Sequence, residues 1–166
     1  MKSTIRFGPA FATLFISMKA GDSIIVESGA MASMSANVDI KTRFNGGFFN
    51  AILRKVFGGE SLFINSFHSN SDAEVVLTQT TPGEISEIEL QGTTLCLQPG
   101  AFIACDPTVR LQLAWAGFAS WFGGEGLFRL KLSGHGRIWL GGYGAIFEKE
   151  IQSEYTVDTG HLIAYE

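Results

Sequence analysis

A glycine-rich phrase that occurs twice constrains the fold more than any other feature of the sequence. The first copy, FGGESLFINSF, begins at Phe57, and the second copy, FGGEGLFRLKL, begins at Phe122. Both copies read Phe-Gly-Gly-Glu, then one variable residue, then Leu-Phe. A long phrase that is repeated in this way indicates a fold built from copies of one unit.

Three turn glycines, Gly29, Gly100 and Gly160, align the copies with one another. They lie in the segments IIVESGAMASMS, LCLQPGAFIACD and TVDTGHLIAYE, where β-forming residues lead into a turn and a bulky apolar residue follows it. Gly21 and Gly92 precede the first two of these glycines at the same spacing, and they indicate an earlier turn. The third copy lacks this earlier glycine, so the repeat is imperfect.

The local sequence predicts two further details of the turns. The segment QPGA at 98–101 fits a type II turn, because proline fixes φ at the second position and Gly100 accepts the positive φ needed at the third. His135 stands between Gly134 and Gly136, so we expect it at the tip of a hairpin.

Short strands follow each turn glycine in the first two copies. We expect them at 37–41 and 108–113, each followed by an apolar insert, the glycine phrase and a pair of strands. The second strand of that pair is expected at 73–78 and at 136–140. Short strands at regular spacing between Gly and Pro turns are typical of an all-β sandwich or barrel.

The copies therefore divide the chain into repeated β units within one domain. We predict a single compact domain over residues 1–166, with units at about 10–80 and 81–141 and a partial third unit at 142–166. A chain of 166 residues is long enough to bury a substantial core. The fold class that we predict is all-β, with the apolar inserts as short helices or loops.

Five phrases carry a family resemblance in their order along the chain: SGAMASMSANVDI, FGGESLFINSF, PGAFIACDPTV, GGEGLFRLKLSGHGRIWLGGYGAI and VDTGHLIAYE. From about Gly21 to Glu166 the chain resembles the mitochondrial-biogenesis AIM (altered inheritance of mitochondria) family. The resemblance implies repeated sandwich units similar to the tryptophan RNA-binding attenuation protein, and chains that associate into trimers or larger rings. Similar proteins continue past the equivalent of GHLIAYE into a further set of strands. The family has no established catalytic or ligand residues, so the resemblance transfers none.

Composition favours buried or associated surfaces. Apolar residues make up 46% of the chain and charged residues only 17%, below the roughly 25% of an average soluble protein. The net charge is −4 and the twelve Lys and Arg residues are scattered, which argues against a nucleic-acid partner. The sequence shows neither a signal-peptide pattern nor a membrane-length apolar run, so we expect a cytoplasmic location. Cys96 and Cys105 are expected to be reduced thiols.

The motifs of common catalytic and cofactor sites do not match this chain. A phosphate-binding loop needs a lysine after its glycines, and neither glycine phrase has one. A dinucleotide fingerprint starting at Gly134 fails because Trp139 stands at its third glycine. His68, His135 and His161 are too far apart in sequence to form a short metal-binding motif. We therefore predict no catalytic residues, no metal site, no cofactor and no enzymatic activity.

Three residues are weak candidates for ligand binding. Glu60 and Glu125 occupy the same place in the two glycine phrases. They are either ligand carboxylates related by pseudo-symmetry or acids that cap backbone N–H groups at a glycine turn, and the second interpretation is favoured. His161 follows a turn glycine where the other copies have Ala30 and Ala101, which makes it unusual within the repeat.

The two apolar inserts are the more promising feature. FNGGFFNAILRKVF at 44–57 and AWAGFASWF at 114–122 both place large apolar residues at helix-like spacing, between a strand and the glycine phrase. They either plug the open ends of the sandwich or form an exposed platform for oligomerisation or for a membrane surface. The candidate interaction residues are Phe48, Phe49, Ile52, Leu53, Trp115, Phe118, Trp121 and Phe122.

These features favour a non-enzymatic oligomeric β scaffold, with a trimer as the preferred homo-oligomer. Through its inserts such a scaffold would contact the inner face of the membrane peripherally. The alternative is a module that binds a small ligand between repeats or between subunits, by analogy with the attenuation protein.

Overall fold

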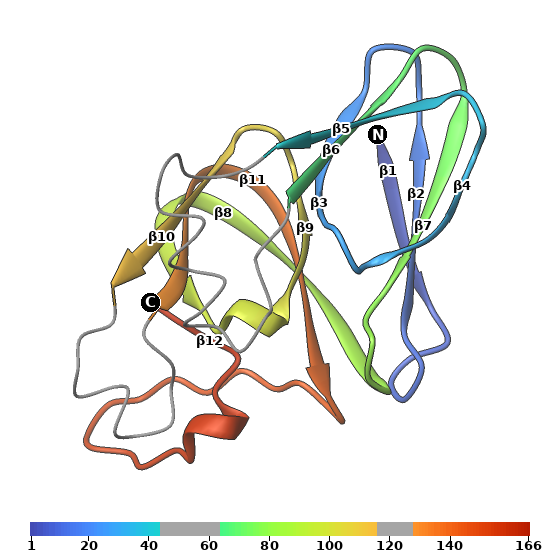
Figure 1. Ribbon diagram of the computed structural model, residues 1–166. Coiled ribbons are helices and arrows are strands. Elements are labelled where there is room, and N and C mark those ends of the chain that lie inside the picture. The colour runs from blue at the N-terminus through green and yellow to red at the C-terminus, as the bar shows by residue number, and fades with distance from the viewer. Residues whose placement is uncertain (44–63, 116–127) are drawn as a thin grey trace.

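The computed structural model describes residues 1–43, 64–115 and 128–166, and nearly all of its regular structure is β-strand (Figure 1). The all-β class predicted from the sequence is therefore confirmed. The strands of the first half are β1 (Lys2–Arg6), β2 (Thr13–Met18), β3 (Ser23–Glu27), β4 (Met31–Met34), β5 (Val38–Arg43), β6 (Ile64–Ser69) and β7 (Ala73–Thr78). The later elements are β8 (Gly83–Leu97), η1 (Pro99–Ala101), β9 (Phe102–Cys105), β10 (Val109–Trp115), β11 (Phe128–Tyr143), η2 (Thr159–His161) and β12 (Ala164–Tyr165).

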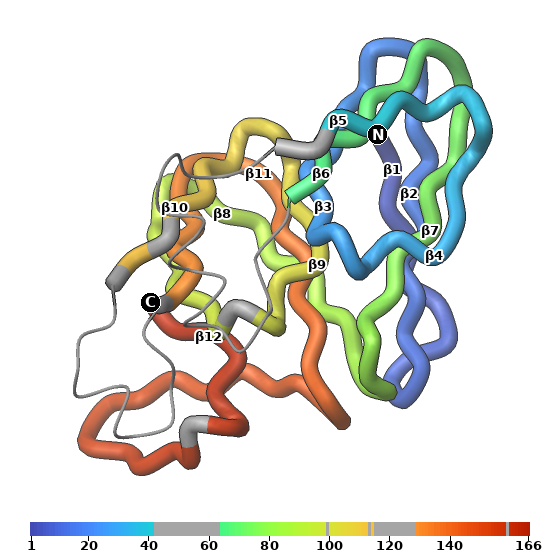
Figure 2. The backbone as a smooth tube through the Cα atoms, viewed as in Figure 1, coloured from blue at the N-terminus to red at the C-terminus, as the bar shows by residue number. Residues whose placement is uncertain are grey.

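The strands form two sheets in which every strand ladder is antiparallel. A 4-stranded sheet has the order β1-β2-β7-β4. An 8-stranded sheet has the order β12-β8-β11-β9-β3-β6-β5, with β10 added on β11. Figure 2 shows the path of the chain through both sheets. The larger sheet joins the two halves of the chain, because β9 pairs with β3.

Strand pairs in the first half have counterparts in the second half. In the first half β2 pairs with β7, and β3 and β5 both pair with β6. In the second half the two long strands β8 and β11 make the equivalent pairs with each other along most of their length. β10 then lies on the first part of β11, as β5 lies on β6, and β9 lies on the second part, as β4 lies on β7. This correspondence is the arrangement that a duplicated unit would produce.

Glycines with positive φ occupy equivalent places in the two halves, but only in the first half does a strand end there. Gly21, with φ +88, lies in the turn between β2 and β3. Gly92, with φ +92, lies inside β8 at the equivalent place and bends the strand without ending it. The expectation that His135 occupies a hairpin tip was wrong, because His135 lies inside β11 where the pairing register shifts. Gly134 and Gly136 both have positive φ there, so they bend β11 while its pairing continues.

The type II turn predicted for the QPGA segment was also wrong. The structure has the short 3-10 helix η1, in which Ala101 N donates to Gln98 O at 3.0 Å. Gly100 does not have a positive φ, which a type II turn would require. Proline is compatible with a type II turn and with a 3-10 helix, because its fixed φ suits the second residue of the turn and the first residue of the helix. The side chain of Ala101 is buried, so the chain leads directly into the buried strand β9.

The core consists of two apolar clusters. The first joins both halves of the chain and includes Ile16, Phe67, Val75 and Trp139, all fully buried. The second lies within the later half and includes residues from β8, β9, β10 and β11. Strands that face a core on one side alternate buried and less buried residues, as β2 does, because successive side chains point to opposite faces. Among the described residues, no helix is long and apolar enough to span a bilayer.

Candidate interaction surface

Most of the residues singled out from the sequence lie outside the described part of the chain. These are Glu60, Glu125, Phe48, Phe49, Ile52, Leu53, Phe118, Trp121 and Phe122. Trp115 is the last residue of β10, and its backbone lies opposite Phe128 of β11. His161 ends η2, and its side chain is 81% exposed with Nδ1 3.2 Å from Asp158 Oδ2. This imidazole therefore lies in solvent beside an equally exposed acid.

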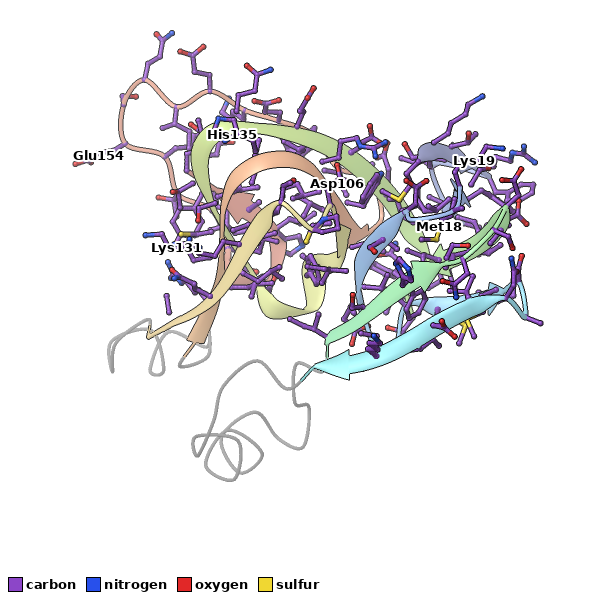
Figure 3. The ribbon with its side chains drawn as sticks, turned by 90° about the horizontal axis from the view of Figure 1, so that it is seen from above. Met18, Lys19, Asp106, Lys131, His135 and Glu154 are labelled. Atoms are coloured by element: carbon purple, nitrogen blue, oxygen red, sulfur yellow. The ribbon has the colours of Figure 1, made fainter. Side chains whose placement is uncertain are left out.

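The strand ends that lead into the two inserts lie on the same side of the molecule. β5 ends at Arg43 and β10 ends at Trp115, and seen from above both arrowheads point toward the same side (Figure 3). The returning strands, β6 and β11, pair with β5 and β10 and begin at the same places. The fold therefore starts both inserts from one side.

Four exposed aromatic residues belong to segments that meet at one end of the molecule, which we call the aromatic end. Phe7 is 66% exposed, Phe11 69%, Tyr143 83% and Phe147 82%. The turn between β1 and β2, the connection from β7 to β8 and the end of β11 meet at this end (Figure 1). Large contiguous apolar patches are uncommon on monomeric proteins and mark interaction surfaces.

Backbone contacts hold the segments of the aromatic end together. Phe11 forms an isolated bridge with Gly83, and Gly83 pairs with Tyr143 at the end of the β8–β11 ladder. The N–H of Ala12 donates to Gly83 O at 3.0 Å. The N–H of Ile146 donates to Glu84 Oε2 at 2.7 Å and so fixes the chain beside Phe147. The four rings are thus displayed by an ordered framework.

The conformation of Phe7 is costly for a side chain of its size. Its φ is +63, and a bulky residue in this region is strained by about 1 to 2 kcal/mol. Its ring meets Phe15 edge-on, with the ring centroids 6.3 Å apart, while most of its surface faces solvent. The aromatic end was not among the surfaces predicted from the sequence. The signal for it in the sequence was a phenylalanine on each side of the Gly8-Pro9 turn, where polar residues are usual.

A second exposed feature is the outer edge of β4. Its counterpart β9 pairs with β11 on one side and with β3 on the other, and all of its residues are buried. Within the described residues β4 pairs with β7 alone, and Met31, Ala32 and Ser33 are exposed. An open strand edge presents unpaired backbone groups that can pair with another strand.

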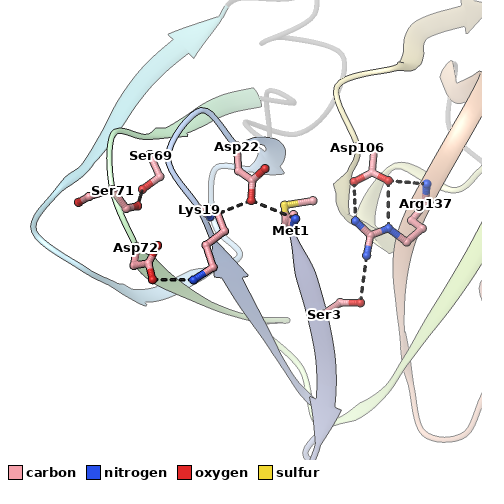
Figure 4. Close-up of polar contacts among 9 residues, drawn as sticks. All are labelled: Met1, Ser3, Lys19, Asp22, Ser69, Ser71, Asp72, Asp106 and Arg137. Atoms are coloured by element: carbon pink, nitrogen blue, oxygen red, sulfur yellow. Dashed lines mark hydrogen bonds and ion pairs between the residues drawn. The ribbon is translucent and has the colours of Figure 1, made fainter.

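A polar cluster around Arg137 joins β1 to the second half of the chain (Figure 4). Asp106 Oδ2 accepts from the backbone N–H of Arg137 at 2.9 Å and from its Nε at 3.0 Å, and Oδ1 accepts from Nη2 at 3.1 Å. Arg137 Nη1 donates to Ser3 Oγ at 3.4 Å. Glu87 Oε2 accepts from Ser3 Oγ and from Trp139 Nε1, both at 2.7 Å. Because these groups satisfy one another, we assign the cluster a structural role.

The first half contains the same contact in a neutral form. Ser35 N donates to Glu74 O at 2.9 Å, and Glu74 N donates to Ser35 Oγ at 2.9 Å. Asp106 and Arg137 make the equivalent two bonds, each at 2.9 Å. The recurrence of the contact in both halves supports a structural role.

Ser23 and His68 form the arrangement that comes nearest to a catalytic pair. Ser23 Oγ lies 2.9 Å from His68 Nδ1, and Asp39 lies opposite His68 on the neighbouring strand. In a catalytic triad the acid binds one imidazole nitrogen and the nucleophile binds the other. Here Asp39 Oδ2 instead accepts a hydrogen bond from the side-chain amide of Asn70 at 2.8 Å. These three side chains therefore do not form the relay of a triad.

The cysteines are free, and Cys105 is fully buried in β9. Burial raises the pKa of the Cys105 thiol, and the nearby Asp106 carboxylate raises it further. A thiol that stays protonated is a poor nucleophile and a poor metal ligand. Among residues 1–43, 64–115 and 128–166, no group of three or more His, Cys, Asp or Glu side chains is placed to hold a metal ion.

Comparison with known proteins places the chain in a family. A family model described as mitochondrial biogenesis AIM24 matches residues 4–166. The chain belongs to this family. An uncharacterized protein of Streptococcus pyogenes serotype M6 is 29% identical over 174 residues, which span 99% of this chain and 70% of that protein.

A solved structure shares both the fold and the sequence pattern. The crystal structure of a Streptococcus pyogenes protein, determined by a structural genomics consortium, matches with a TM-score of 0.78 and 30% identity. The match covers 98% of this chain and 74% of that chain. The AIM resemblance inferred from the sequence is therefore confirmed. The likeness to the tryptophan RNA-binding attenuation protein stays a prediction.

Proposed function

We propose that this AIM24 family member is a non-catalytic β scaffold that self-associates through exposed apolar surface. The observation that carries the proposal is the aromatic end, where Phe7, Phe11, Tyr143 and Phe147 are each more than half exposed on an ordered framework. Burying a phenylalanine side chain contributes roughly 1.5 to 3 kcal/mol, so four rings offer a substantial gain on association. Strain at Phe7 favours the same view, because strained backbone gathers at functional surfaces and the ring is mostly in solvent.

The two inserts extend the proposal. The strands that lead into them, β5 and β10, end on one side of the fold, and we infer that an assembled scaffold would present several inserts together. A trimer is the homo-oligomer that we favour. Weak apolar contacts multiplied in this way would bring the assembly to the inner face of a membrane as a peripheral protein. Because the chain carries a net charge of −4, such contact would be apolar and would gain little from anionic lipids.

Substitutions at the aromatic end test the proposal. Phe11→Ser and Phe147→Ser remove exposed rings, and Phe7→Asn removes a ring while keeping a residue that tolerates positive φ. We expect each variant to remain folded and to shift the association midpoint, measured by light scattering during size-exclusion chromatography, to higher protein concentration. Ile40→Ser is the matched control, since Ile40 is an exposed apolar residue on β5, away from the aromatic end. Variants that associate like the wild-type chain would refute this use of the aromatic end.

Vesicle binding tests the membrane part separately. We expect co-sedimentation with phosphatidylcholine vesicles to fall several-fold when Trp121 and Phe122 of the second insert are both changed to serine. The paired change Phe48→Ser and Phe49→Ser tests the first insert in the same way, and Ile40→Ser again serves as the control. Adding phosphatidylglycerol should not restore the binding. Equal binding by the wild-type chain and a variant of either insert would exclude that insert as a membrane contact.

A further inference from the structure

We propose that the outer edge of β4 pairs with residues 155–157 of a second copy of the chain, so that copies join head to tail. This inference rests on the proposed self-association and names one surface through which it occurs. It follows from two strand contacts, β9 with β3 and β12 with β8, that share one register. At the third equivalent place, the edge of β4, the described residues form no such contact.

The two formed contacts share one register. Where β9 meets β3, Ala104 lies opposite Val26. Where β12 meets β8, Ala164 lies opposite Leu97. In both cases the residue three positions before one turn glycine pairs with the residue four positions after the next turn glycine. The same geometric rule therefore governs both contacts.

Applied to the remaining turn glycines, the rule pairs β4 with the segment before Gly160. Val157 is three positions before Gly160, and Ser33 is four positions after Gly29. The rule therefore places Val157 opposite Ser33, and Thr156 opposite Met34. In the described chain neither partner is used in this way, because β4 pairs with β7 alone and residues 145–158 contain no strand.

Side-chain burial supports this match. In β3 the residues Ile24 and Val26 are fully buried, and in β8 their counterparts Leu95 and Leu97 are 7% and 0% exposed. Tyr155 and Val157 stand at the same positions relative to Gly160, yet they are 57% and 38% exposed. Tyr-Thr-Val is a sequence of strong β-formers. The segment thus has the pattern of a buried strand without its partner.

The opposite positions of the two surfaces favour a second copy. β4 lies at the outer side of the first half, while the chain after β11 passes beneath the second half (Figure 1). From above, Glu154 again lies on the side opposite Lys19, which is in the β2–β3 turn of the first half (Figure 3). The segment is also tethered to β8 a few residues later, since Gln98 N donates to Ile163 O at 3.0 Å. A contact between two different surfaces is heterologous and generates either a closed ring or an open chain of copies.

A cysteine-exchange experiment tests the register directly. Gln98 and Ile163 form a hydrogen-bonded pair, and such pairs alternate along antiparallel strands, so the neighbouring Leu97–Ala164 pair is non-hydrogen-bonded. Ser33 and Val157 stand at the positions equivalent to Ala164 and Leu97, so they would also form a non-hydrogen-bonded pair. Side chains of such pairs are close enough for a disulfide. We expect a mixture of Ser33→Cys chains and mass-tagged Val157→Cys chains to give a covalent heterodimer under mild oxidation. The yield should be several-fold above that of Thr80→Cys with Val157→Cys, because Thr80 is exposed but outside the register.

Two results would overturn the pairing while leaving the scaffold proposal standing. The first is a heterodimer yield equal to the Thr80→Cys control although the wild-type chain associates. The second is a Ser33→Cys, Val157→Cys double variant that cross-links only within single chains, which would place the segment on β4 of its own chain. A wild-type chain that stays monomeric would instead remove both proposals.

A proline substitution gives an independent test. The N–H of Gln98 points toward β12, and N–H groups two residues apart in a strand point the same way, so the N–H of Cys96 also points toward β12. Thr156 stands at the position equivalent to Cys96, so its N–H would point toward β4 of the second copy. Thr156→Pro deletes this donor, whereas Thr156→Ala keeps it. We expect the proline variant to weaken association many-fold with an unchanged melting temperature, and the alanine variant to associate normally. Equal association by the two variants would overturn the pairing.

Discussion

At the residue scale, Asp106 and Ser35 close equivalent turns with different chemistry. The N–H of Val109 donates to Asp106 O, and the N–H of Val38 donates to Ser35 O, so each residue opens the turn that leads from one strand to the next. Asp106 adds a charged contact to Arg137, and both side chains are mostly buried, at 17% and 25% exposed. Hydrogen bonds to charged groups contribute more than neutral ones. The second half therefore depends more on its turn residue than the first half does.

Alanine substitutions should reveal this difference. We expect Asp106→Ala to lower the free energy of unfolding by about 2 kcal/mol, and Ser35→Ala by about 1 kcal/mol. Urea denaturation of the two variants measures both values. Equal losses would show that the ion pair with Arg137 contributes nothing beyond the shared backbone contact.

Asp22 makes stability depend on acid pH. Its pKa is lowered, first by the hydrogen bond from the Lys19 backbone N–H and then by the Met1 amino group, 3.0 Å from Oδ2. The unfolded chain therefore binds a proton at this site at a higher pH than the folded chain does. The resulting stability is present above the unfolded pKa of about 3.9 and is lost as pH falls through the lower folded pKa.

Asp22→Asn tests this dependence. We expect the variant to be less stable than the wild-type chain at neutral pH, with the difference shrinking as pH falls below about 4. Thermal unfolding followed across this pH range measures the effect. A difference that does not change with pH would show that the carboxylate charge is not responsible.

At the element scale, glycines set how closely β8 and β11 approach their neighbours. A Cβ on Gly83 would overlap the carbonyl of Gly142, and Gln79 Nε2 donates to that carbonyl at 3.1 Å. A Cβ on Gly142 would meet Ile163. These glycines are therefore required for close packing, independently of their φ angles.

Two alanine substitutions compare a glycine that close packing requires with a glycine that it does not. We expect Gly83→Ala to destabilise the fold by about 1 to 3 kcal/mol, because backbone must move to accept the methyl group. Gly100→Ala is the control, since a Cβ there meets nothing within 4 Å and φ is not positive. It should be neutral or slightly stabilising. Similar melting temperatures for both variants would contradict the packing account.

The strands show where sequence reasoning succeeds. Those expected at 37–41, 73–78 and 108–113 correspond to β5, β7 and β10. They could be predicted because apolar residues that alternate between two turns indicate a strand with one buried and one exposed face. The break expected at Gly134–Gly136 is a bend inside β11. A glycine pattern indicates that the backbone needs unusual φ, but it does not tell whether pairing continues through the bend, since that depends on partner strands distant in sequence.

The same limit applies to the candidate sites. Glu60, Glu125 and most of the insert residues lie outside the described chain, so their roles stay predictions. The aromatic end was not predicted, because Phe11 and Tyr143 become neighbours of Gly83 only through tertiary pairing. The β4 edge likewise could not be identified until its counterpart β9 was seen paired on both sides. Exposure is a property of the assembled sheets and not of the local sequence.

At the scale of the whole molecule, the two halves of the chain are joined through a contact that can propagate. β9 of the second half pairs with β3 of the first half, and β12 pairs with β8 in the same register. The aromatic end and the β4 edge remain on the surface of this arrangement. Self-association is the account that gives both surfaces a partner.

Sedimentation equilibrium of the wild-type chain over a wide concentration range tests this account most directly. The chain has a mass of 18.0 kDa. We expect a weight-average mass that is a multiple of this value at high concentration and that falls toward it on dilution. A mass of 18.0 kDa at every concentration would contradict the proposal that this protein is a self-associating scaffold.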